Sequence, residues 1–426
     1  MKKTDKVLVT GASGFIGSHL LRLLHEKGYR NLRSTSFSRD LRNDFEGTSE
    51  VEHIKGDLQN AEFCELISKD VDVVFHCAAN TSNALDTKFN PLLHVTPNVE
   101  MNVNLMEQSW KNKVRKFLFI SSNTTYPDMG TEFCTEDMNV HATPMLPVYK
   151  AVGGMKRYGE MLCDFFSNQI HEPMQCLIVR PSNAFGPNDK FDFEKCHVTP
   201  ANIRKVADGL NPIPVWGDGT EVRDVIHVDD MVSGFICVAE NVDKYDVYNV
   251  CYGSGYTVNE VLDTIKSIEN NDNPIEYVSN KAPMIPVRLL SNRRLKSLGW
   301  KPKYNLAALV KEMITSDLKI FKYPKISYVE DPKDSTGTHL IATVLLTSRK
   351  KYSLGLDFDA FTSTIQQFGI GFKASFSIRN VFKRAEIFEI SAKGRVGSSK
   401  DAGDNESRFF NNSDIGADLK LIFPRI

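Results

Sequence analysis

Up to about residue 322, short apolar runs alternate with amphipathic stretches along the chain. Four runs are nearly continuous and rich in β-branched or aromatic residues, which is typical of strands covered on both faces of a sheet. They occupy residues 6–10, 72–79, 116–122 and 176–182. Amphipathic segments at 18–28 and 155–166 predict helices between such strands. The alternation predicts βαβ units, and therefore an α/β fold with a doubly wound parallel sheet of the Rossmann type.

The pattern changes twice further along the chain. From about residue 187 it loosens into loops rich in Pro and Gly, which predicts a small C-terminal substrate lobe set against the sheet. Near residue 323 the period becomes two, as in YSLGLDFDAF, which predicts an antiparallel, β-rich tail. The three expected parts are a Rossmann domain over 1–186, a substrate lobe interleaved with it over 187–322, and the tail over 323–426.

Composition narrows the class of protein. Hydrophobic residues make up 41% and charged residues 25%, which fits a soluble globular chain. The formal net charge of -1 provides no basic field for nucleic acid, so any anionic ligand must be held by local donors. No run reaches the roughly 18 apolar residues that a membrane helix needs. The eight cysteines lack metal-binding spacing, which favours reduced, buried thiols in a cytoplasmic protein without a metal site.

A glycine-rich turn, GASGFIG, leads from the first predicted strand straight into a predicted helix. Gly11 permits a tight turn, Gly14 lets the backbone approach a pyrophosphate, and Gly17 lets helix and strand pack closely. The free N–H groups at the start of the helix then suit the phosphates. This strand–turn–helix context makes the turn a specific sign of a dinucleotide site. The predicted phosphate-binding residues are Gly11, Ser13, Gly14, Phe15, Ile16 and Gly17.

The residues after the second strand bear on the choice between NADP and NAD. An acid there would accept the ribose hydroxyls of NAD, whereas this chain has Ser38 and Arg39. A hydroxyl and a guanidinium suit the 2′-phosphate of NADP, so we prefer NADP. Asp40 keeps NAD open, and Arg39 could be an ordinary surface residue. Asp57 follows the third strand, where it could hydrogen-bond the adenine or cap its own loop.

Several separate motifs in one order resemble the extended short-chain dehydrogenase/reductase (NAD-dependent epimerase/dehydratase) family, and within it the nucleotide-sugar epimerases, dehydratases and reductases. They are TGASGFIGSHL at 10–20, GD at 56–57, HCAA at 76–79, SSNTTYP at 121–127, RPSNAFGP at 180–187, GDGTEVRDVIHVDD at 217–230 and LGW at 298–300. The resemblance covers roughly residues 5–320, and CHVTPANIRK with PVWGDGTEVRD is most similar to GDP-L-fucose synthases. It implies hydride exchange at C4 of a nucleotide-diphosphate sugar. It also adds Leu58, Ala78 and Ala79 to the cofactor site and leaves a homodimer open.

The resemblance implies most of a catalytic site. In this family a Tyr is the acid or base at the sugar hydroxyl, a Lys four residues later supports it and holds the ribose, and a Ser completes the hydrogen bonding. Ser122 matches the serine, and Lys156 matches the lysine through its K-x-x-G-E-x-L run. The tyrosine position is then Val152, which carries no proton. Tyr149, one turn earlier, is either the replacement or an ordinary half-buried tyrosine.

The resemblance also implies a substrate site. Fucose-synthase-like enzymes epimerise with a Cys and a His, and His197 matches the His, with an acid–base, a substrate-binding or a structural role. Thr124 stands at the Cys position, so we do not expect that double epimerisation. Two arginines would clamp the diphosphate and a tryptophan could pack on the nucleotide, although both types also occur as plain surface or packing residues. The implied substrate-binding residues are Thr124, Asn183, His197, Trp216, Arg223 and Arg288.

The tail resembles a second, unrelated family. YSLGLDFDAF, SFSIRNVFKRAEIFEISAKGRVGSS and RFFNNSDIGADLKLIFPRI are similar to early strands of the BamA/TamL surface-antigen outer-membrane barrels. A closed barrel needs about eight strands and only four or five are visible here, so we expect a partial-barrel-like fragment without a function of its own. A membrane partner follows only if the tail is functional. The chain is therefore an enzyme, a cofactor-binding protein without turnover, or an outer-membrane assembly component.

Overall fold

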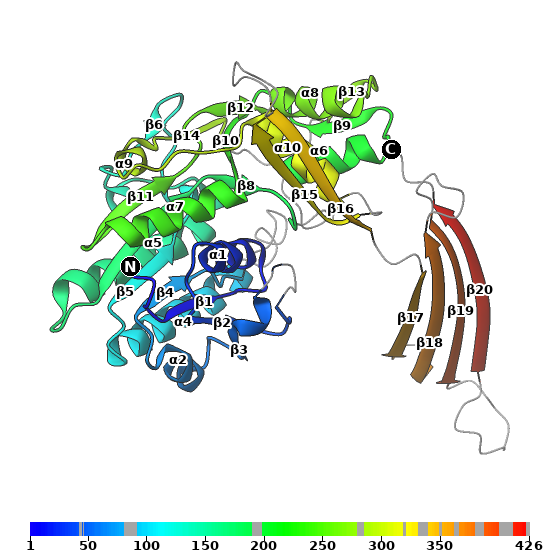
Figure 1. Ribbon diagram of the computed structural model, residues 1–426, viewed down its shortest axis with the longest axis horizontal. Coiled ribbons are helices and arrows are strands. Elements are labelled where there is room, and N and C mark those ends of the chain that lie inside the picture. The colour runs from blue at the N-terminus through cyan, green and yellow to red at the C-terminus, as the bar shows by residue number, and fades with distance from the viewer. Residues whose placement is uncertain are drawn as a thin grey trace. The chain divides into compact units, whose positions relative to one another are not determined.

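The structure is a computed structural model that describes most of the chain. The described residues are 1–41, 45, 47–80, 92–189, 198–278, 285–317, 321–330, 340–348, 352–361, 366–379, 387–399 and 412–422. The chain forms two compact units, residues 1–314 and 315–426 (Figure 1). The finer boundaries expected at 186/187 and 322/323 stay predictions.

A seven-stranded sheet forms the centre of the first unit, in the order β11-β7-β5-β4-β1-β2-β3 (Figure 1). Its strands are β1 (Val7–Thr10), β2 (Leu32–Ser36), β3 (Glu52–Lys55), β4 (Val73–His76), β5 (Lys116–Ile120), β7 (Gln175–Pro181) and β11 (Asp246–Val250). All six pairings are parallel, which confirms the predicted doubly wound sheet. The chain winds away from β1 and β4 in opposite directions, so the ligand crevice is expected beyond their carboxyl ends.

Helices cover both faces of this sheet, and the strand side chains explain why. Val7 and Val9 lie in one apolar cluster with Leu20 of the first helix, whereas Leu8 lies in a second cluster with Cys64 and Leu105. Successive strand residues point to opposite faces, so both faces need apolar side chains. The helices are α1 (Phe15–Glu26) and α7 (Val228–Asn241) on the first face, and α2 (Ala61–Ser68), α4 (Leu92–Lys111) and α5 (Lys150–Asp164) on the second.

Smaller sheets and helices complete the first unit around a third apolar cluster that includes Phe185, Ile203 and Leu262. The strands are β6 (Phe133–Cys134), β8 (Asn183–Phe185), β9 (Ile213–Trp216), β10 (Val222–His227), β12 (Gly255–Thr257), β13 (Ile275–Val278) and β14 (Val287–Leu290). The helices are α6 (Val198–Ala207), α8 (Val258–Glu269), α9 (Arg293–Ser297) and α10 (Leu306–Asp317). Short helical turns are η1 (Thr48–Glu50), η2 (Asn123–Thr125), η3 (Val140–Ala142), η4 (Pro147–Tyr149) and η5 (Phe165–Gln169). Within the described residues, no helix is both long and apolar enough to cross a membrane.

The second unit consists of antiparallel strands, which confirms the β-rich tail that the period of two predicted. One pair is β15 (Phe321–Glu330) with β16 (Leu340–Ser348), and one four-stranded sheet is β17 (Tyr352–Phe361), β18 (Gln366–Arg379), β19 (Ile387–Ser399) and β20 (Asn412–Ile422). Phe376, Ile390 and Leu419 are aligned across neighbouring strands and therefore share one face. Leu419 is 69% exposed and Ile415, on the same face, is 87% exposed. This sheet is therefore amphipathic.

Candidate active site

The turn between β1 and α1 has the shape that a bound pyrophosphate requires. Gly11 has a φ of 65°, in the left-handed region, and a Cβ there would lie 2.7 Å from the Cα atom of Ala78. A Cβ on Gly17 would lie 2.3 Å from the carbonyl oxygen of Gly11, so helix and turn are in direct backbone contact. Gly14 is extended and provides no side-chain cap, so the first N–H groups of α1 remain for a ligand. These features fit a dinucleotide.

The residues predicted to meet the adenosine ribose follow β2. Ser38 and Arg39 are exposed, and the Ser36 hydroxyl donates to the Arg39 carbonyl oxygen at 2.5 Å, which closes this turn. Asp40 forms an ion pair with Lys55 on β3. The hydrogen bond and charge of Lys55 hold the pKa of Asp40 below its ordinary value. Because the carboxylate is engaged by Lys55, the guanidinium of Arg39 is the stronger candidate for a ligand contact.

The remaining predicted cofactor residues lie at the carboxyl ends of β3 and β4. Asp57 Oδ1 accepts a hydrogen bond of 2.9 Å from the Gln59 N–H, so Asp57 caps its own turn. Leu58 is buried, whereas Ala79 is exposed. The Ala78 N–H donates to Thr10 Oγ1 at 3.2 Å, which ties the end of β4 to the end of β1.

A buried histidine that sequence reasoning missed joins these two strands to helix α4. The Thr10 hydroxyl donates to His76 Nδ1 at 2.8 Å, and His76 Nε2 donates to Asn102 Oδ1 at 2.9 Å. Burial lowers the pKa of His76 to about 4, with the charge of Lys156 acting in the same direction and the Asn102 bond opposing. His76 is therefore neutral at physiological pH. The HCAA motif was a signal for this position.

Ser122 follows β5 and caps η2. Its Oγ accepts hydrogen bonds from the Thr124 N–H at 3.1 Å and from the Thr124 hydroxyl at 2.9 Å. Because Thr124 supplies both hydrogens, the hydroxyl hydrogen of Ser122 remains to be donated to another oxygen. Thr124 thus orients the serine from the position where a fucose-synthase-like enzyme would have its Cys.

Lys156 on α5 reaches the same end of β5. Its Nζ donates to the Ile120 carbonyl oxygen at 2.7 Å and lies 5.2 Å from the centre of the Phe119 ring. Burial lowers the pKa of Lys156 to about 8, which the charges of Glu160 and Cys77 partly oppose. Ile120 precedes Ser122 by two residues, so the amine and the serine hydroxyl lie at one edge of the sheet.

The helix that carries Lys156 is continuous from Lys150 to Asp164. Val152 therefore lies one turn before Lys156 on the same helical face, where the family's tyrosine is expected. Tyr149 is the N-cap of this helix, and its ring centre lies 5.9 Å from the guanidinium carbon of Arg288. Burial lowers the pKa of Arg223, and the nearby phenol of Tyr149 opposes this. Tyr149 thus lies beside two arginines.

These arginines are neighbours across two strands. Arg223 on β10 is paired in register with Arg288 on β14. Arg288 is buried and donates to the carbonyl oxygens of Tyr126 at 3.0 Å and Pro127 at 3.1 Å. Arg223 also donates to two backbone carbonyls, at 2.8 and 3.0 Å. A guanidinium has five N–H donors, so both side chains retain donors for a phosphate.

Three further predicted substrate residues have different surroundings. Asn183 Oδ1 accepts from the Asn123 side chain at 3.5 Å, which brings the start of β8 to the turn that carries Ser122. Trp216 ends β9 and is 59% exposed, so its indole face is accessible to a ligand. His197 lies outside the described residues.

Two groups of buried contacts that sequence reasoning missed hold α5 against the sheet and against η2. Glu160 accepts from the Ser121 hydroxyl at 2.5 Å and from Arg180 at 2.9 and 2.6 Å. Arg157 donates to the carbonyl oxygens of Thr125 and Thr143, each at 2.6 Å. The sequence signals were Glu160 in the K-x-x-G-E run, Ser121 in SSNTTYP and Arg180 in RPSNAFGP, but none of these motifs shows that the three residues meet.

Gly153 brings α5 into backbone contact with η2. A Cβ there would lie 2.6 Å from the Thr124 carbonyl oxygen. At Gly154, the next residue, a Cβ would meet only the Met145 Cε atom, at 3.6 Å. The contact of Gly153 therefore fixes the register between the helix of Lys156 and the turn of Ser122.

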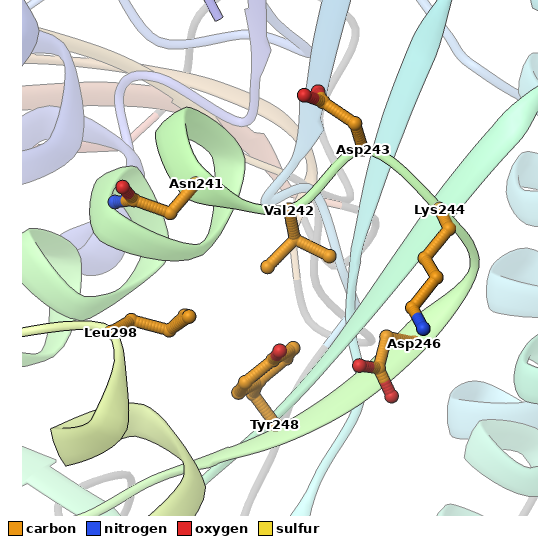
Figure 2. A pocket seen from close by; sticks show the side chains of 7 residues that line it. All are labelled: Asn241, Val242, Asp243, Lys244, Asp246, Tyr248 and Leu298. Carbon is orange, nitrogen blue, oxygen red and sulfur yellow. The ribbon is translucent and has the colours of Figure 1, made fainter.

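A pocket of about 310 Å³ lies away from these residues (Figure 2). Its lining side chains are Asn241, Val242, Asp243, Lys244, Asp246, Tyr248 and Leu298. It surrounds the start of β11, and therefore the amino edge of the parallel sheet, opposite the phosphate turn. Asp243 accepts from the Lys116 amine at 3.0 Å, and Asp246 accepts from Arg294 at 2.6 Å. The two carboxylates of this pocket are thus already paired with basic side chains. The end of the sheet at the carboxyl termini of its strands therefore remains the better candidate for the active site.

The chain is similar to known proteins over its first unit. The model of the NAD dependent epimerase/dehydratase family matches residues 7–251. GDP-L-fucose synthase 1 of Arabidopsis thaliana is 25% identical over 310 residues, which are 71% of this chain and 90% of that protein. UDP-glucose 4-epimerase of Dictyostelium discoideum is 28% identical over 325 residues, with 71% and 92% covered. The crystal structure of UDP-glucose 4-epimerase from Thermotoga maritima with UDP-glucose has a TM-score of 0.65 and 26% identity, and the match covers 73% of this chain and 97% of that one. The family model does not reach the tail, whose resemblance to outer-membrane barrels stays a prediction.

Proposed function

Because the chain belongs to the NAD dependent epimerase/dehydratase family, we infer that it is an NAD(P)-dependent enzyme that exchanges hydride with C4 of a nucleotide-diphosphate sugar. Its reaction is that of an epimerase, a dehydratase or a 4-keto reductase. The relatives named above act, by their names, on GDP- and UDP-linked sugars, which supports this substrate class.

The observation that carries this proposal is the convergence of three groups at the carboxyl edge of β1, β4 and β5. The phosphate turn adjoins the end of β4 through Gly11 and Ala78. Ser122 follows β5, and Lys156 is hydrogen-bonded to the last residue of β5. A dinucleotide bound on the turn would therefore extend towards a hydroxyl donor and an amine, which is the arrangement that hydride exchange at a carbinol carbon requires.

Bound NADP or NAD supplies the group that accepts and returns hydride. The turn from Gly11 to Gly17 would hold its pyrophosphate against the first N–H groups of α1. Ser38 and Arg39 would meet the adenosine ribose, which favours NADP because a guanidinium suits a 2′-phosphate. Asp57 would accept from the adenine. The remaining residues proposed to line this cofactor are Leu58, Ala78, Ala79 and Lys156.

The substrate would lie across the gap from the nicotinamide. Arg223 and Arg288 would bind its diphosphate with the N–H groups that the backbone carbonyls leave unused. Trp216 would pack on the base, and Asn183 would contact the sugar. The Ser122 hydroxyl, held from behind by Thr124, would donate to the sugar oxygen. His197 would bind the substrate or act as an acid–base residue.

A second candidate function is favoured by one observation. Val152 occupies the position of the family's tyrosine on a continuous helix, so the usual acid–base group is missing. The chain would then be a protein that binds the cofactor without turning over a sugar. The same cofactor-binding residues serve both functions.

The test uses the purified full chain loaded with NADP or NAD. Reduced-nicotinamide absorbance and conversion of the sugar to a new product are both followed while UDP-, GDP-, dTDP- and CDP-sugars and their 4-keto forms are added, because epimerisation and dehydration leave the net absorbance unchanged. We expect an absorbance change or a new product with one nucleotide class. Bound cofactor with neither outcome in any class would reject the enzyme in favour of the cofactor-binding protein. The Gly17→Ala variant, which should bind the dinucleotide poorly, is the control.

A further inference from the structure

The proposed reaction needs a group that takes a proton from the sugar hydroxyl, and the family's group for this is absent. We propose that the Lys156 amine itself takes the proton from this hydroxyl and returns it, a role that rests on the proposed function. In its usual setting such a lysine only supports a tyrosine. Here three observations give the proton-transfer role to the lysine.

The first observation is that the helix register cannot bring Tyr149 to the position of Val152. Such a shift moves α5 by three residues and places Lys150 where Gly153 now lies. The Cβ of any residue other than glycine would then be 2.6 Å from the Thr124 carbonyl oxygen. Real Cβ atoms do not approach a backbone oxygen so closely. Val152 therefore stays opposite the turn of Ser122.

The second observation is the location of Tyr149. It lies seven positions before Lys156, which is about 10 Å along the helix at roughly 1.5 Å per residue. Its ring lies 5.9 Å from the Arg288 guanidinium carbon, and its phenol acts on Arg223. The phenol thus belongs with the two arginines proposed to bind the diphosphate. A diphosphate lies several bonds away from the sugar C4.

The third observation is the surroundings of Lys156. Nζ donates one hydrogen to the Ile120 carbonyl oxygen at 2.7 Å, which aims the amine at the carboxyl edge beside Ser122. Among the described residues, no carboxylate lies within ion-pair distance of this amine. Burial lowers the pKa of this amine and outweighs Glu160 on its own helix and Cys77 after β4, which raise it. Burial and the charge of Lys156 lower the pKa of His76 on β4. Because the ammonium is buried without a paired anion, the neutral amine forms near physiological pH.

The step balances without a further reactant. In the oxidative direction the C4–H bond breaks and hydride passes to the oxidised nicotinamide dinucleotide. The O4–H bond breaks, its proton forms a new N–H bond on the neutral Lys156 amine, and C4 becomes a carbonyl carbon. In the reductive direction the Lys156 ammonium returns the proton to O4. The Ser122 hydroxyl donates to the same oxygen in both directions.

The test compares the parent with Lys156→Arg, which keeps the positive charge but does not lose a proton in the working pH range. We expect cofactor affinity within about threefold and a kcat that is about a hundredfold lower or less, as for a lost general base. The parent's oxidative kcat should rise about tenfold per pH unit up to roughly pH 8 and then level off. Lys150→Arg, at the exposed start of the same helix, should leave all three quantities unchanged.

A second readout does not depend on turnover. In protein labelled with ¹³C at the lysine ε-carbons, the signal lost in Lys156→Arg should titrate near pH 8 in the parent. A midpoint above about 10, the ordinary lysine value, would overturn the assignment. A Lys156→Arg variant with the parental kcat and the same pH dependence of kcat would also overturn the assignment of Lys156. The proposed function would not be affected by that result. A parent that binds cofactor but turns over no nucleotide sugar would overturn both.

Discussion

The contact between Gly153 and η2 provides a sharp test of the active site, because Gly154 is a matched neighbour on the same helix. In Gly153→Ala the new Cβ would lie 2.6 Å from the Thr124 carbonyl oxygen, whereas ordinary contact begins at 3.4 Å. The turn must therefore move by the difference, 3.4 minus 2.6, or about 0.8 Å. In Gly154→Ala the new Cβ makes only an ordinary contact with Met145 at 3.6 Å.

The two variants share one effect on stability and differ in another. Each should gain up to about 1 kcal/mol, because Ala is a better helix former than Gly. Only Gly153→Ala should also lose roughly 1–3 kcal/mol through overpacking. The difference between the two free energies of unfolding therefore reports the crowding of this Cβ by Thr124 and by the Met145 Sδ atom, which would lie 2.9 Å from it, at roughly 1–3 kcal/mol. It is measured by urea denaturation of both full-length variants.

The same displacement should change catalysis. It moves Ser122 and Thr124 relative to Lys156 by most of an ångström, and a misplacement of about 1 Å can cost about a hundredfold in rate. We expect kcat to fall about 10- to 100-fold in Gly153→Ala and to stay within about twofold in Gly154→Ala. Turnover of the active nucleotide sugar is followed by formation of its product. Equal stability and equal kcat in the two variants would refute the assignment of Gly153 as the residue that sets this register.

Three further outcomes are expected. Gly17→Ala should weaken dinucleotide binding at least about tenfold, because its Cβ would lie 2.3 Å from the Gly11 carbonyl oxygen; unchanged quenching in a fluorescence titration with reduced cofactor would contradict this. Glu160→Gln leaves a buried arginine without its anion and should lower the free energy of unfolding by about 3–5 kcal/mol, whereas Glu26→Gln, in an exposed pair, should change it by less than about 1 kcal/mol. Burial lowers the pKa of His76 from 6.5 to about 4. Its contribution to the free energy of unfolding, roughly 3 kcal/mol, should therefore be complete above pH 6.5 and be lost as the pH falls towards 4. In urea denaturation at several pH values, the free energy of unfolding of His76→Gln should fall less steeply below pH 6.5 than that of the parent.

The central sheet was predictable from the sequence because its signal is local. Both faces of each strand are covered, so the runs at 6–10 and 176–182 are apolar over most of their length, and β1 and β7 lie within a residue of them. Ser38 and Arg39, expected after the second strand, do follow β2, which ends at Ser36. The antiparallel tail was predictable for the same reason, since apolar and polar residues alternate along each of its strands.

The contacts of the site were less predictable because they join distant parts of the chain. Helix α5 was expected to begin near residue 155, after two glycines that are poor helix formers, but it begins at Lys150. Gly153 lies in the helix because the absence of a side chain lets η2 approach. The bonds of His76 to Thr10 and Asn102 likewise depend on strand order, which no local pattern specifies.

The amphipathic sheet of the tail has a consequence for how the protein is handled. Its apolar face carries Ile415 and Leu419, both largely exposed, and β17 and β20 are its outer strands within the described residues. Such surfaces bind one another, so association should grow with protein concentration and weaken in mild detergent. Light scattering at crystallisation concentrations would then measure association through the tail, while turnover in dilute solution would measure the activity of the first unit. Aggregation state and specific activity should therefore vary independently from one preparation to the next.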